Sequence, residues 1–464
     1  MSKAWTLGLR YGIITLKPIT QGGLHMMQAE QMDKEGIMAA AAKFQKVFSE
    51  SDLNALGKEI GLCERERTIT PFKLALSVVT SLACNQVESL ADLQREFNAL
   101  TETKIGYKAF YNQLAKAEFP EMMLAITSLA IKQMSFNVLG FREGCPFCKF
   151  RQILIHDGSS FALKDALAQI FPGRFSAVSP AAVELHTTMD LLSDTAVRIV
   201  LTADTESEQA NFPDARQLKD CLFLGDRGFV NLSYMHEVDQ NGGSFIIRGK
   251  KGLNPWVMDA WCEDGSRPRR FRNKTLTEIL DRLPKRQATD LEVGWEMDGE
   301  PIIFRMIVTW NSQTKEFQYL ITNLDYPQFS LRDVCLAYHL RWQVELLFKE
   351  WKSYANLHAF DTANPDIAEG LIWASIIAAA LKRFLAHATQ LACRVATSTR
   401  KVAMCAAHPI RLLVSALKTG SLSEILTALQ KGLSYLATNA LRAHPKRDRE
   451  SGRSQLGLEP IFLE

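Results

Sequence analysis

The spacing of hydrophobic positions changes along this chain, and the first part of it predicts helices. From about residue 30 to residue 140, apolar residues recur at helical spacing and strand patterns are few. Thr70-Pro71 is typical of a helix start, because threonine caps the helix and proline fits its first turn. Ser89 with Asp92 resembles a capping box. A third helix is expected from Tyr107 to Ala117.

That third segment carries lysines and tyrosines along its length. Three short helices that end in a basic, aromatic one form a shape that can dock on DNA. A plain helical domain with a solvated lysine face explains the same pattern. The sequence leaves both explanations open.

Near Gln152 the pattern changes to short apolar strands that alternate with helices. One strand is predicted from Gln152 to Asp157, followed by a Gly-Ser-Ser turn, and another from Cys221 to Gly225, ending at Asp226. The other predicted elements of this part are strands at 183–192, 196–203 and 244–248 and helices near 215–219 and 232–240. The order predicts an α/β sheet with helices on its faces.

Residues 252 to 329 interrupt this order. They begin with a basic run, which comprises Arg267, Arg269, Arg270, Arg272 and Lys274. Strand patterns follow within 291–296, 302–310 and 317–322, so an inserted, mostly β subdomain is expected. Helices resume at about Ser330 and continue to the end of the chain.

Composition narrows the class of protein. The 464 residues are 47% hydrophobic and 23% charged, as in globular proteins with several cores. The net charge of +3 is small, so a nucleic-acid partner would need local basic patches. An odd number of cysteines (nine) suits a reducing compartment. The first 30 residues show no secretory pattern, and the apolar run from Leu371 to Leu381 is too short to span a bilayer. We therefore expect a cytoplasmic protein without a membrane partner.

The most informative stretch runs from Tyr338 to Lys352. On a helix with about 100° per residue, Tyr338, Arg341 and Lys352 fall within about 40° of Glu345, while most apolar residues take the opposite side. One explanation is a row of salt bridges on the helix surface, a surface ladder, since Arg341 and Glu345 are an i,i+4 ion pair. The other is a metal-binding glutamate bordered by groups that grip phosphates.

Two aspartates favour the second explanation. Asp157 and Asp226 each follow an apolar strand, at the edge where open α/β sheets place their ligands. One such aspartate alone is commonly a turn or cap residue. Two of them together with Glu345 fit an oxygen-ligand site for Mg²⁺, and two ions about 4 Å apart can serve in-line phosphoryl displacement.

These residues also resemble a known family. The spacing Tyr338-x2-Arg341-x3-Glu345-x6-Lys352 matches the Y-x2-R-x3-E-x6-K signature of insertion-sequence-4-type bacterial DDE transposases. The blocks 156–160 and 224–229 resemble that family's blocks around its two aspartates. The likeness covers about 150 to 385 and includes the β-rich insertion before the glutamate helix. It implies an RNase H-like mixed sheet with helices on both faces, interrupted by the insertion and flanked by N- and C-terminal helical regions.

The resemblance implies cut-and-paste transposition of an insertion sequence. Asp157, Asp226 and Glu345 would be catalytic and would hold two Mg²⁺ ions, for which Mn²⁺ can substitute. Homodimers would bind the terminal inverted repeats, nick them, form hairpin ends and insert the element into target DNA, in the bacterial cytoplasm at the nucleoid. The residues expected to bind DNA are Tyr338, Arg341, Trp342, Lys352, Arg267, Arg269, Arg270 and Arg272.

Trp342 follows the signature arginine, where relatives stack a flipped base, although packing in the core is an alternative. Trp310 and Tyr319 are both candidates for a second aromatic, from the insertion, that would act as a wedge. The expected units are a DNA-end-binding helical region (1–150), the catalytic core (151–251 and 330–385), the insertion (252–329) and a helical region for dimerisation (386–464). Two other functions remain open: a repressor or architectural protein that keeps the fold, and a general nuclease.

Overall fold

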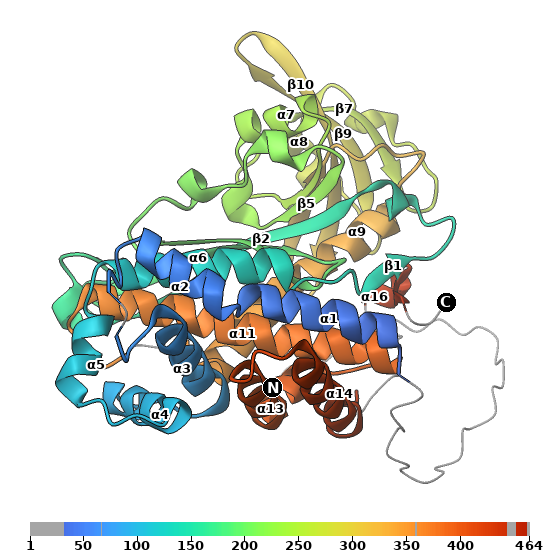
Figure 1. Cartoon of the computed structure of the whole chain (residues 1–464). Helices are drawn as coiled ribbons and strands as arrows, with labels where there is room; N and C mark the ends of the chain where they lie inside the picture. Colours follow the sequence, from blue (N-terminus) through green and yellow to red (C-terminus); the bar gives the residue numbers. More distant parts are fainter. Residues whose placement is uncertain (1–31, 66, 358–359, 443–451, 462–464) are drawn as a thin grey trace.

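The computed structural model describes residues 32–65, 67–357, 360–442 and 452–461. It consists of one large sheet beside a body of helices (Figure 1). The first 30 residues, in which no secretory pattern was expected, lie outside the described ranges.

The main sheet has ten strands in the order β4-β3-β2-β5-β6-β11-β10-β9-β7-β8. The strands are β2 (Gln152–Ala162), β3 (Ala182–Asp190), β4 (Thr195–Ala203), β5 (Cys221–Gly225), β6 (Ser244–Arg248), β7 (Trp256–Cys262), β8 (Lys274–Thr275), β9 (Thr289–Met297), β10 (Glu300–Asn311) and β11 (Glu316–Thr322). Strands β2, β5 and β6 are parallel, and the β3–β4 hairpin joins β2 in antiparallel fashion.

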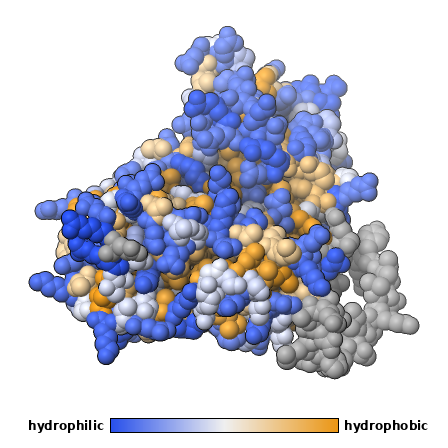
Figure 2. All heavy atoms as spheres, in the orientation of Figure 1, coloured by the Kyte–Doolittle hydropathy of each residue, from blue (hydrophilic) through white to orange (hydrophobic). Residues whose placement is uncertain are grey.

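The insertion is β-rich as predicted, but its strands do not form a sheet of their own. Strand β11 pairs antiparallel with β6 through Leu320 and Arg248, so the inserted strands continue the sheet of the preceding part. The sequence could not show this pairing, because it joins residues more than 70 positions apart. The insertion rises at the top of the view, where hydrophilic side chains cover most of the visible surface (Figure 2).

Side-chain alternation places cores on both faces of this sheet. On β5, Leu222 and Leu224 belong to the core shared with the long helices, whereas Phe223 belongs to a second core under the insertion and α7 (Leu232–Gln240). Helices therefore flank both faces, as predicted.

Strand β2 differs from its prediction. The turn expected at Gly158-Ser159-Ser160 is extended strand, and β2 continues to Ala162 because the long partner β3 pairs with it as far as Ala182. Asp157 thus lies inside a strand. Its parallel neighbour β5 ends at Gly225, so Asp157 still stands at the edge of the parallel part.

The N- and C-terminal helices form one body around α11 (Pro365–Cys393), with which α3, α6 and α14 pack. The remaining helices are α1 (Lys34–Val47), α2 (Glu50–Glu59), α3 (Pro71–Cys84), α4 (Leu90–Thr101), α5 (Tyr107–Leu114), α6 (Glu118–Gln133), α8 (Leu276–Ile279), α9 (Leu331–His339), α10 (Gln343–Tyr354), α12 (Thr399–Cys405), α13 (Ala407–Leu417), α14 (Leu422–Asn439) and α16 (Gly452–Gln455). The predicted cap at Thr70 and the capping box at Ser89 are both confirmed.

Helix α11 is long and apolar enough to cross a membrane by length and composition, the only such helix among the described residues. However, 94% of its most apolar window is buried inside the protein. It is therefore the central helix of the core.

A short second sheet ties the end of the chain to its middle. Strand β12 (Leu458–Pro460) pairs antiparallel with β1 (Leu139–Phe141), which lies just before the main sheet.

Candidate active site

The pairing of β2 with β5 brings two predicted aspartates together. Ile155 is paired with Leu224, and Asp157 and Asp226 each follow two residues later. The two carboxylates therefore emerge at the same level of neighbouring strands. Asp226 caps the turn that follows β5, since its Oδ1 accepts a hydrogen bond of 2.7 Å from the Gly228 N–H.

The third carboxylate comes from α10, which packs against β2. Arg341 joins the two elements: its Nη1 lies 2.8 Å from Asp157 Oδ2 and its Nη2 lies 2.7 Å from Glu345 Oε1. The side chains of Asp157 and Arg341 are only 18% and 16% exposed, so this contact is shielded from bulk water. The i,i+4 pair predicted from the sequence is therefore part of a buried contact and not a surface ladder.

Charge is concentrated around Asp157. Burial, opposed by Arg341 and reinforced by the neighbouring charge of Asp226, raises the pKa of Asp157 to about 6. Such a carboxylate favours a bound cation, because a cation offsets both the lost hydration and the repulsion from Asp226.

One acidic side chain near Asp226 was not predicted from the sequence. Glu208 lies in a 3₁₀ turn after β4, and a Cβ placed on Gly228 would stand 2.7 Å from Glu208 Oε2 and 3.0 Å from Asp226 Oδ1. Burial, followed by the charges of Asp226, Glu184 and Asp157, raises the pKa of Glu208 to about 6. Glu208 carries no motif and no periodic pattern, so nothing in the sequence distinguished it.

Gly158 makes room for another acid beneath the site. A Cβ on Gly158 would stand 2.2 Å from Glu184 Oε1, and Glu184 forms an ion pair of 3.0 Å with Arg174. The glycine after Asp157 is therefore required by this packing and not by a turn.

The remaining signature residues lie on the same side as Glu345, but not on one straight helix. A 3₁₀ turn (Leu340–Trp342) separates α9 from α10. Tyr338 is largely buried, which raises its pKa, and Lys352 donates to the Ser160 carbonyl at 2.9 Å. Burial lowers the pKa of Lys352.

Trp342 points into an open cavity. Its side chain is 48% exposed, so the alternative that it packs in the core is wrong. Trp342 and Trp310 line a cavity of about 640 Å³ together with Arg248, Tyr338 and Arg341. Of the two candidates from the insertion, Trp310 lies in this cavity, whereas Tyr319 packs against Gly249.

The basic run of the insertion is divided. Arg267 and Arg272 both form ion pairs with Asp259, at 2.6 Å and 2.5 Å, so much of their charge is already neutralised. Arg269 and Arg270 are exposed and have no ion pair among the residues that the structure describes. That all four arginines bind DNA stays a prediction, and Arg269 and Arg270 are the two whose charge is not paired with an acid of the described residues.

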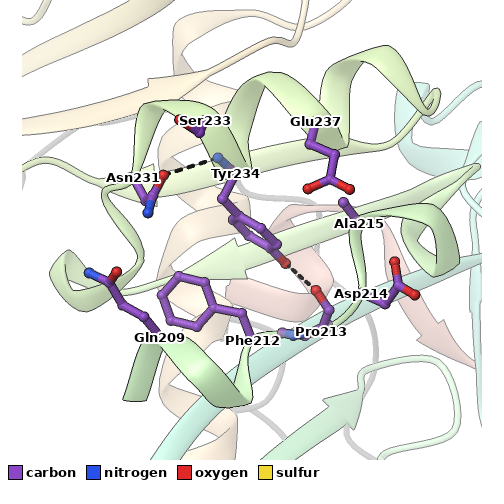
Figure 3. A pocket seen from close by; sticks show the side chains of 9 residues that line it. All are labelled: Gln209, Phe212, Pro213, Asp214, Ala215, Asn231, Ser233, Tyr234 and Glu237. Atoms are coloured by element: carbon purple, nitrogen blue, oxygen red, sulfur yellow. Dashed lines mark hydrogen bonds between the residues drawn. The ribbon is translucent and has the colours of Figure 1, made fainter. Parts of the chain in front are cut away.

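A smaller cavity of about 370 Å³ lies between α7 and the turns before β5 (Figure 3). Its wall is fixed by Tyr234, whose hydroxyl donates to the Pro213 carbonyl at 2.8 Å, and by Phe212, which stacks on Phe229 at 4.2 Å between ring centroids. Phe229 belongs to the turn after Asp226. The wall of this cavity thus packs against the turn that follows Asp226. The charged residues that line the cavity, Asp214 and Glu237, are both acidic.

The donor chemistry of the site suits a hard divalent cation, since its acidic side chains are all carboxylates. In the described part of the chain, no three Asp, Glu, His or Cys side chains stand in position to hold one ion. The guanidinium of Arg341 contacts Asp157 and Glu345 instead. The residue types therefore fit a metal site, while a cationic side chain already balances part of their charge.

Comparisons with known proteins agree on one family. Residues 149–381 match the family described as "Transposase DDE domain". The transposase for insertion sequence element IS231F of Bacillus thuringiensis subsp. israelensis is 19% identical over 455 residues, which cover 89% of this chain and 93% of the relative. The transposase for insertion sequence element IS1151 of Clostridium perfringens is 20% identical over 346 residues, covering 66% of this chain and 72% of the relative.

A similar solved structure is that of a piggyBac transposase synaptic complex with hairpin DNA. It has a TM-score of 0.47 and 11% identity, and the match covers 86% of this chain and 87% of that one.

Proposed function

The chain belongs to the DDE transposase domain family, and on that premise we propose that Asp157, Asp226 and Glu345 form its catalytic site and hold two Mg²⁺ ions. It is a DDE-type insertion sequence transposase, which catalyses DNA cleavage and strand transfer. The observation that carries the assignment of the site is the way in which the sheet and Arg341 connect the three carboxylates. Two stand side by side at the edge of the parallel strands, and Arg341 links one of them to the third.

An RNase H-like core is part of this proposal. The five strands β4-β3-β2-β5-β6, an antiparallel hairpin followed by parallel strands, support it. Divalent ions would polarise the reacting phosphate and lower the pKa of the attacking water or hydroxyl.

The chain's own residues prepare the DNA for this chemistry. Arg341, Tyr338 and Lys352 lie beside the carboxylates and would hold backbone phosphates of the cut strand, which fixes the reacting phosphorus in line. Partial burial around Asp157 strengthens the contacts that Arg341 makes there. Exposed Arg269 and Arg270 would add a sequence-independent grip on the duplex.

We further propose that terminal inverted repeats are the substrate, that two copies of the chain act together, and that the reaction takes place in the bacterial cytoplasm. The homology to insertion sequence transposases over most of their length supports the substrate.

The proposed site is tested by removing one carboxylate at a time. Nicking of a labelled transposon end should disappear in Asp157→Ala, Asp226→Ala and Glu345→Ala and in the presence of a chelator. DNA binding should remain, because other residues provide the phosphate grip. Glu296→Ala, which removes an exposed acid of β9, should leave nicking unchanged. Persistent nicking in one of the three variants removes that residue from the mechanism, and binding without any nicking by the unmutated chain favours a repressor or architectural protein.

The aromatic cavity supports a hairpin route. In a hairpin the freed 3′ hydroxyl attacks the opposite strand, which requires a sharply distorted duplex end. Flipping a base costs a few kcal/mol, and stacking on an aromatic ring offsets about 1–3 kcal/mol of it. The exposed face of Trp342 and the nearby Trp310 would supply that stacking.

Trp342→Ala and Trp310→Ala should therefore leave the first nick nearly intact and make hairpin ends scarce on a denaturing gel. Trp256→Ala is the matched control, because Trp256 is 57% exposed but lies outside the cavity. An equal fall of nick and hairpin would show that these tryptophans only stabilise the fold. If no hairpin forms with the unmutated chain, the hairpin route is wrong.

A further inference from the structure

Residues 452–461 lie against α9 and against the start of α10, the helix that carries Glu345. Strand β12 is held by β1, and Arg142 Nε lies 2.5 Å from Glu459 Oε1. Gly452, at the start of α16, packs on the junction of α9 and α10, where an added Cβ would stand 3.3 Å from Leu340 Cδ2. Residues 452–461, the C-terminal strap, thus cover the junction that precedes Glu345.

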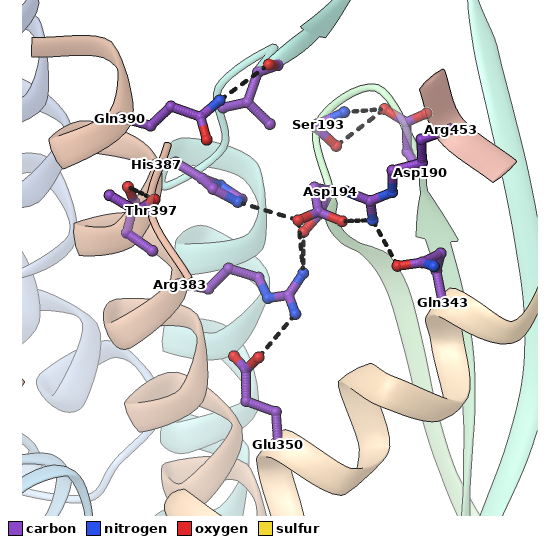
Figure 4. Close-up of polar contacts among 12 residues, drawn as sticks. Asp190, Ser193, Asp194, Gln343, Glu350, Arg383, His387, Gln390, Thr397 and Arg453 are labelled. Carbon is purple, nitrogen blue, oxygen red and sulfur yellow. Dashed lines mark hydrogen bonds and ion pairs between the residues drawn. The ribbon is translucent and has the colours of Figure 1, made fainter. Parts of the chain in front are cut away.

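One side chain of the strap reaches α10 directly. Arg453 Nη2 lies 2.6 Å from Asp194 Oδ1 and 2.7 Å from Gln343 Oε1 (Figure 4). The Arg453 side chain is only 13% exposed. Gln343 begins α10, two residues before Glu345, and Asp194 lies in the β3–β4 turn, so Arg453 links the glutamate helix to the sheet.

Asp194 is the centre of a buried charge network. Arg383 of α11 lies 3.4 Å from Asp194 Oδ2 and 3.0 Å from Glu350 Oε2, and His387 lies 3.6 Å from Asp194. Burial opposes ionisation of Asp194, but Arg453 and Arg383 hold its pKa well below the usual range. Asp194 therefore stays charged and keeps its partners in place.

The network holds α10 at two points on one face. At about 100° per residue, Gln343 and Glu350 lie within about 20° of each other and about 140–160° from Glu345. Arg453 holds the first point and Arg383 holds the second. Two ties on the face opposite Glu345 fix the rotation of the helix about its axis, and that rotation decides where the Glu345 carboxylate points.

We infer that Arg453 is a positioning residue, which fixes the rotation of α10 so that Glu345 faces Asp157 and Asp226. The inference rests on the proposed function, because it concerns the same carboxylate site. Removal of Arg453 leaves no buried acid without a partner, since Asp194 keeps its contacts with Arg383 and His387. The main effect is therefore the loss of the Gln343 tie, and the fold should persist.

The test measures metal binding without reaction. Mn²⁺ is titrated by electron paramagnetic resonance into the full chain bound to a pre-nicked transposon end that lacks the 3′ hydroxyl. Arg453→Ala should weaken Mn²⁺ binding about tenfold, which is the lower end of the loss that follows when a group that orients a metal ligand is removed. Arg453→Lys should not restore it, because one ammonium group cannot reproduce the planar, multi-donor geometry of the guanidinium. Gln343→Ala breaks the same tie from the other end, and in combination with Arg453→Ala it should add little further loss.

Glu459→Ala is the matched control, since it removes the strap's exposed ion pair with Arg142 but leaves Arg453 and the hydrogen bonds from Arg142 to Ser454 in place. Its Mn²⁺ affinity should equal that of the unmutated chain. Unchanged affinity in folded Arg453→Ala and Gln343→Ala overturns the inference, and so does an equal loss in Glu459→Ala. If Arg453→Ala does not fold, Gln343→Ala decides alone. Failure of the unmutated chain to bind Mn²⁺ contradicts the proposed metal site itself, which separates the two failures.

Discussion

Lys382 is a single residue whose charge is costly to bury. It lies in α11 with 5% of its surface exposed, and its ammonium group donates to the Tyr354 carbonyl at the end of α10. Burial, partly offset by the nearby Cys84 and Glu350, lowers its pKa from 10.5 to about 8. The folded chain therefore releases this proton at a lower pH than the unfolded chain does.

This shift predicts a pH dependence of stability. Between pH 8 and about 10.5 the unfolded chain binds the Lys382 proton and the folded chain does not, so this residue makes the free energy of unfolding rise with pH. In Lys382→Met that contribution is absent. The difference in unfolding free energy between variant and unmutated chain should change by up to about 1.4 kcal/mol per pH unit in that window.

Denaturant unfolding at several pH values checks this. Lys418→Met removes a lysine that is 41% exposed and should leave the pH dependence unchanged. A constant difference between Lys382→Met and the unmutated chain from pH 8 to 10.5 would mean that the buried lysine keeps its proton.

At the scale of elements, local sequence patterns predicted the strands and the helix that carry the three carboxylates. The contacts between these elements join distant residues and could not be predicted. Asp226 was placed correctly because its strand and the following turn are both visible in the sequence. Asp157 was taken for a strand end, because its Gly-Ser-Ser neighbours are typical of a turn and pairing with β3 overrides that preference. Arg341 was paired with Glu345 from their i,i+4 spacing, but its contact with Asp157 joins residues 184 positions apart. Glu208 and Arg453 act through such distant contacts and carry no local signal.

The basic turn of the insertion yields a prediction at this scale. Arg269 and Arg270 are exposed and form no ion pair with the described residues, whereas Arg267 and Arg272 share Asp259. Replacing Arg269 and Arg270 with Ala should reduce the slope of log binding constant against log salt concentration by up to about 0.9 for each phosphate that is no longer bound. Arg267→Ala with Arg272→Ala should change the slope less. Equal slopes in both double variants and the unmutated chain would show that the turn is only a solvated loop.

At the scale of the whole molecule, chain segments far apart in sequence come together at two places, around helix α11 and on the main sheet. Helices from both ends pack on α11, and the glutamate helix packs on a sheet whose aspartates come from two strands paired 69 positions apart. The small net charge of +3 gave no indication of a DNA partner, because the acidic and basic residues of the chain nearly balance in number. The proposed metal site therefore depends on the carboxylates of Asp157, Asp226 and Glu345.

The most direct measurement asks whether each carboxylate touches the metal. Asp157, Asp226 and Glu345 are replaced in turn by Cys, and nicking and strand transfer of a labelled transposon end are compared in Mg²⁺, in Mn²⁺ and in Mn²⁺ supplemented with Zn²⁺. Mg²⁺ demands oxygen ligands, whereas softer ions accept a thiolate. If the three carboxylates bind the metal, each Cys variant is inactive in Mg²⁺ and regains cleavage with a softer ion, while the corresponding Ala variants stay inactive in all three conditions. Cys variants that remain as inactive as the Ala variants, or Ala variants that still cleave in Mg²⁺, would contradict metal binding by the carboxylates.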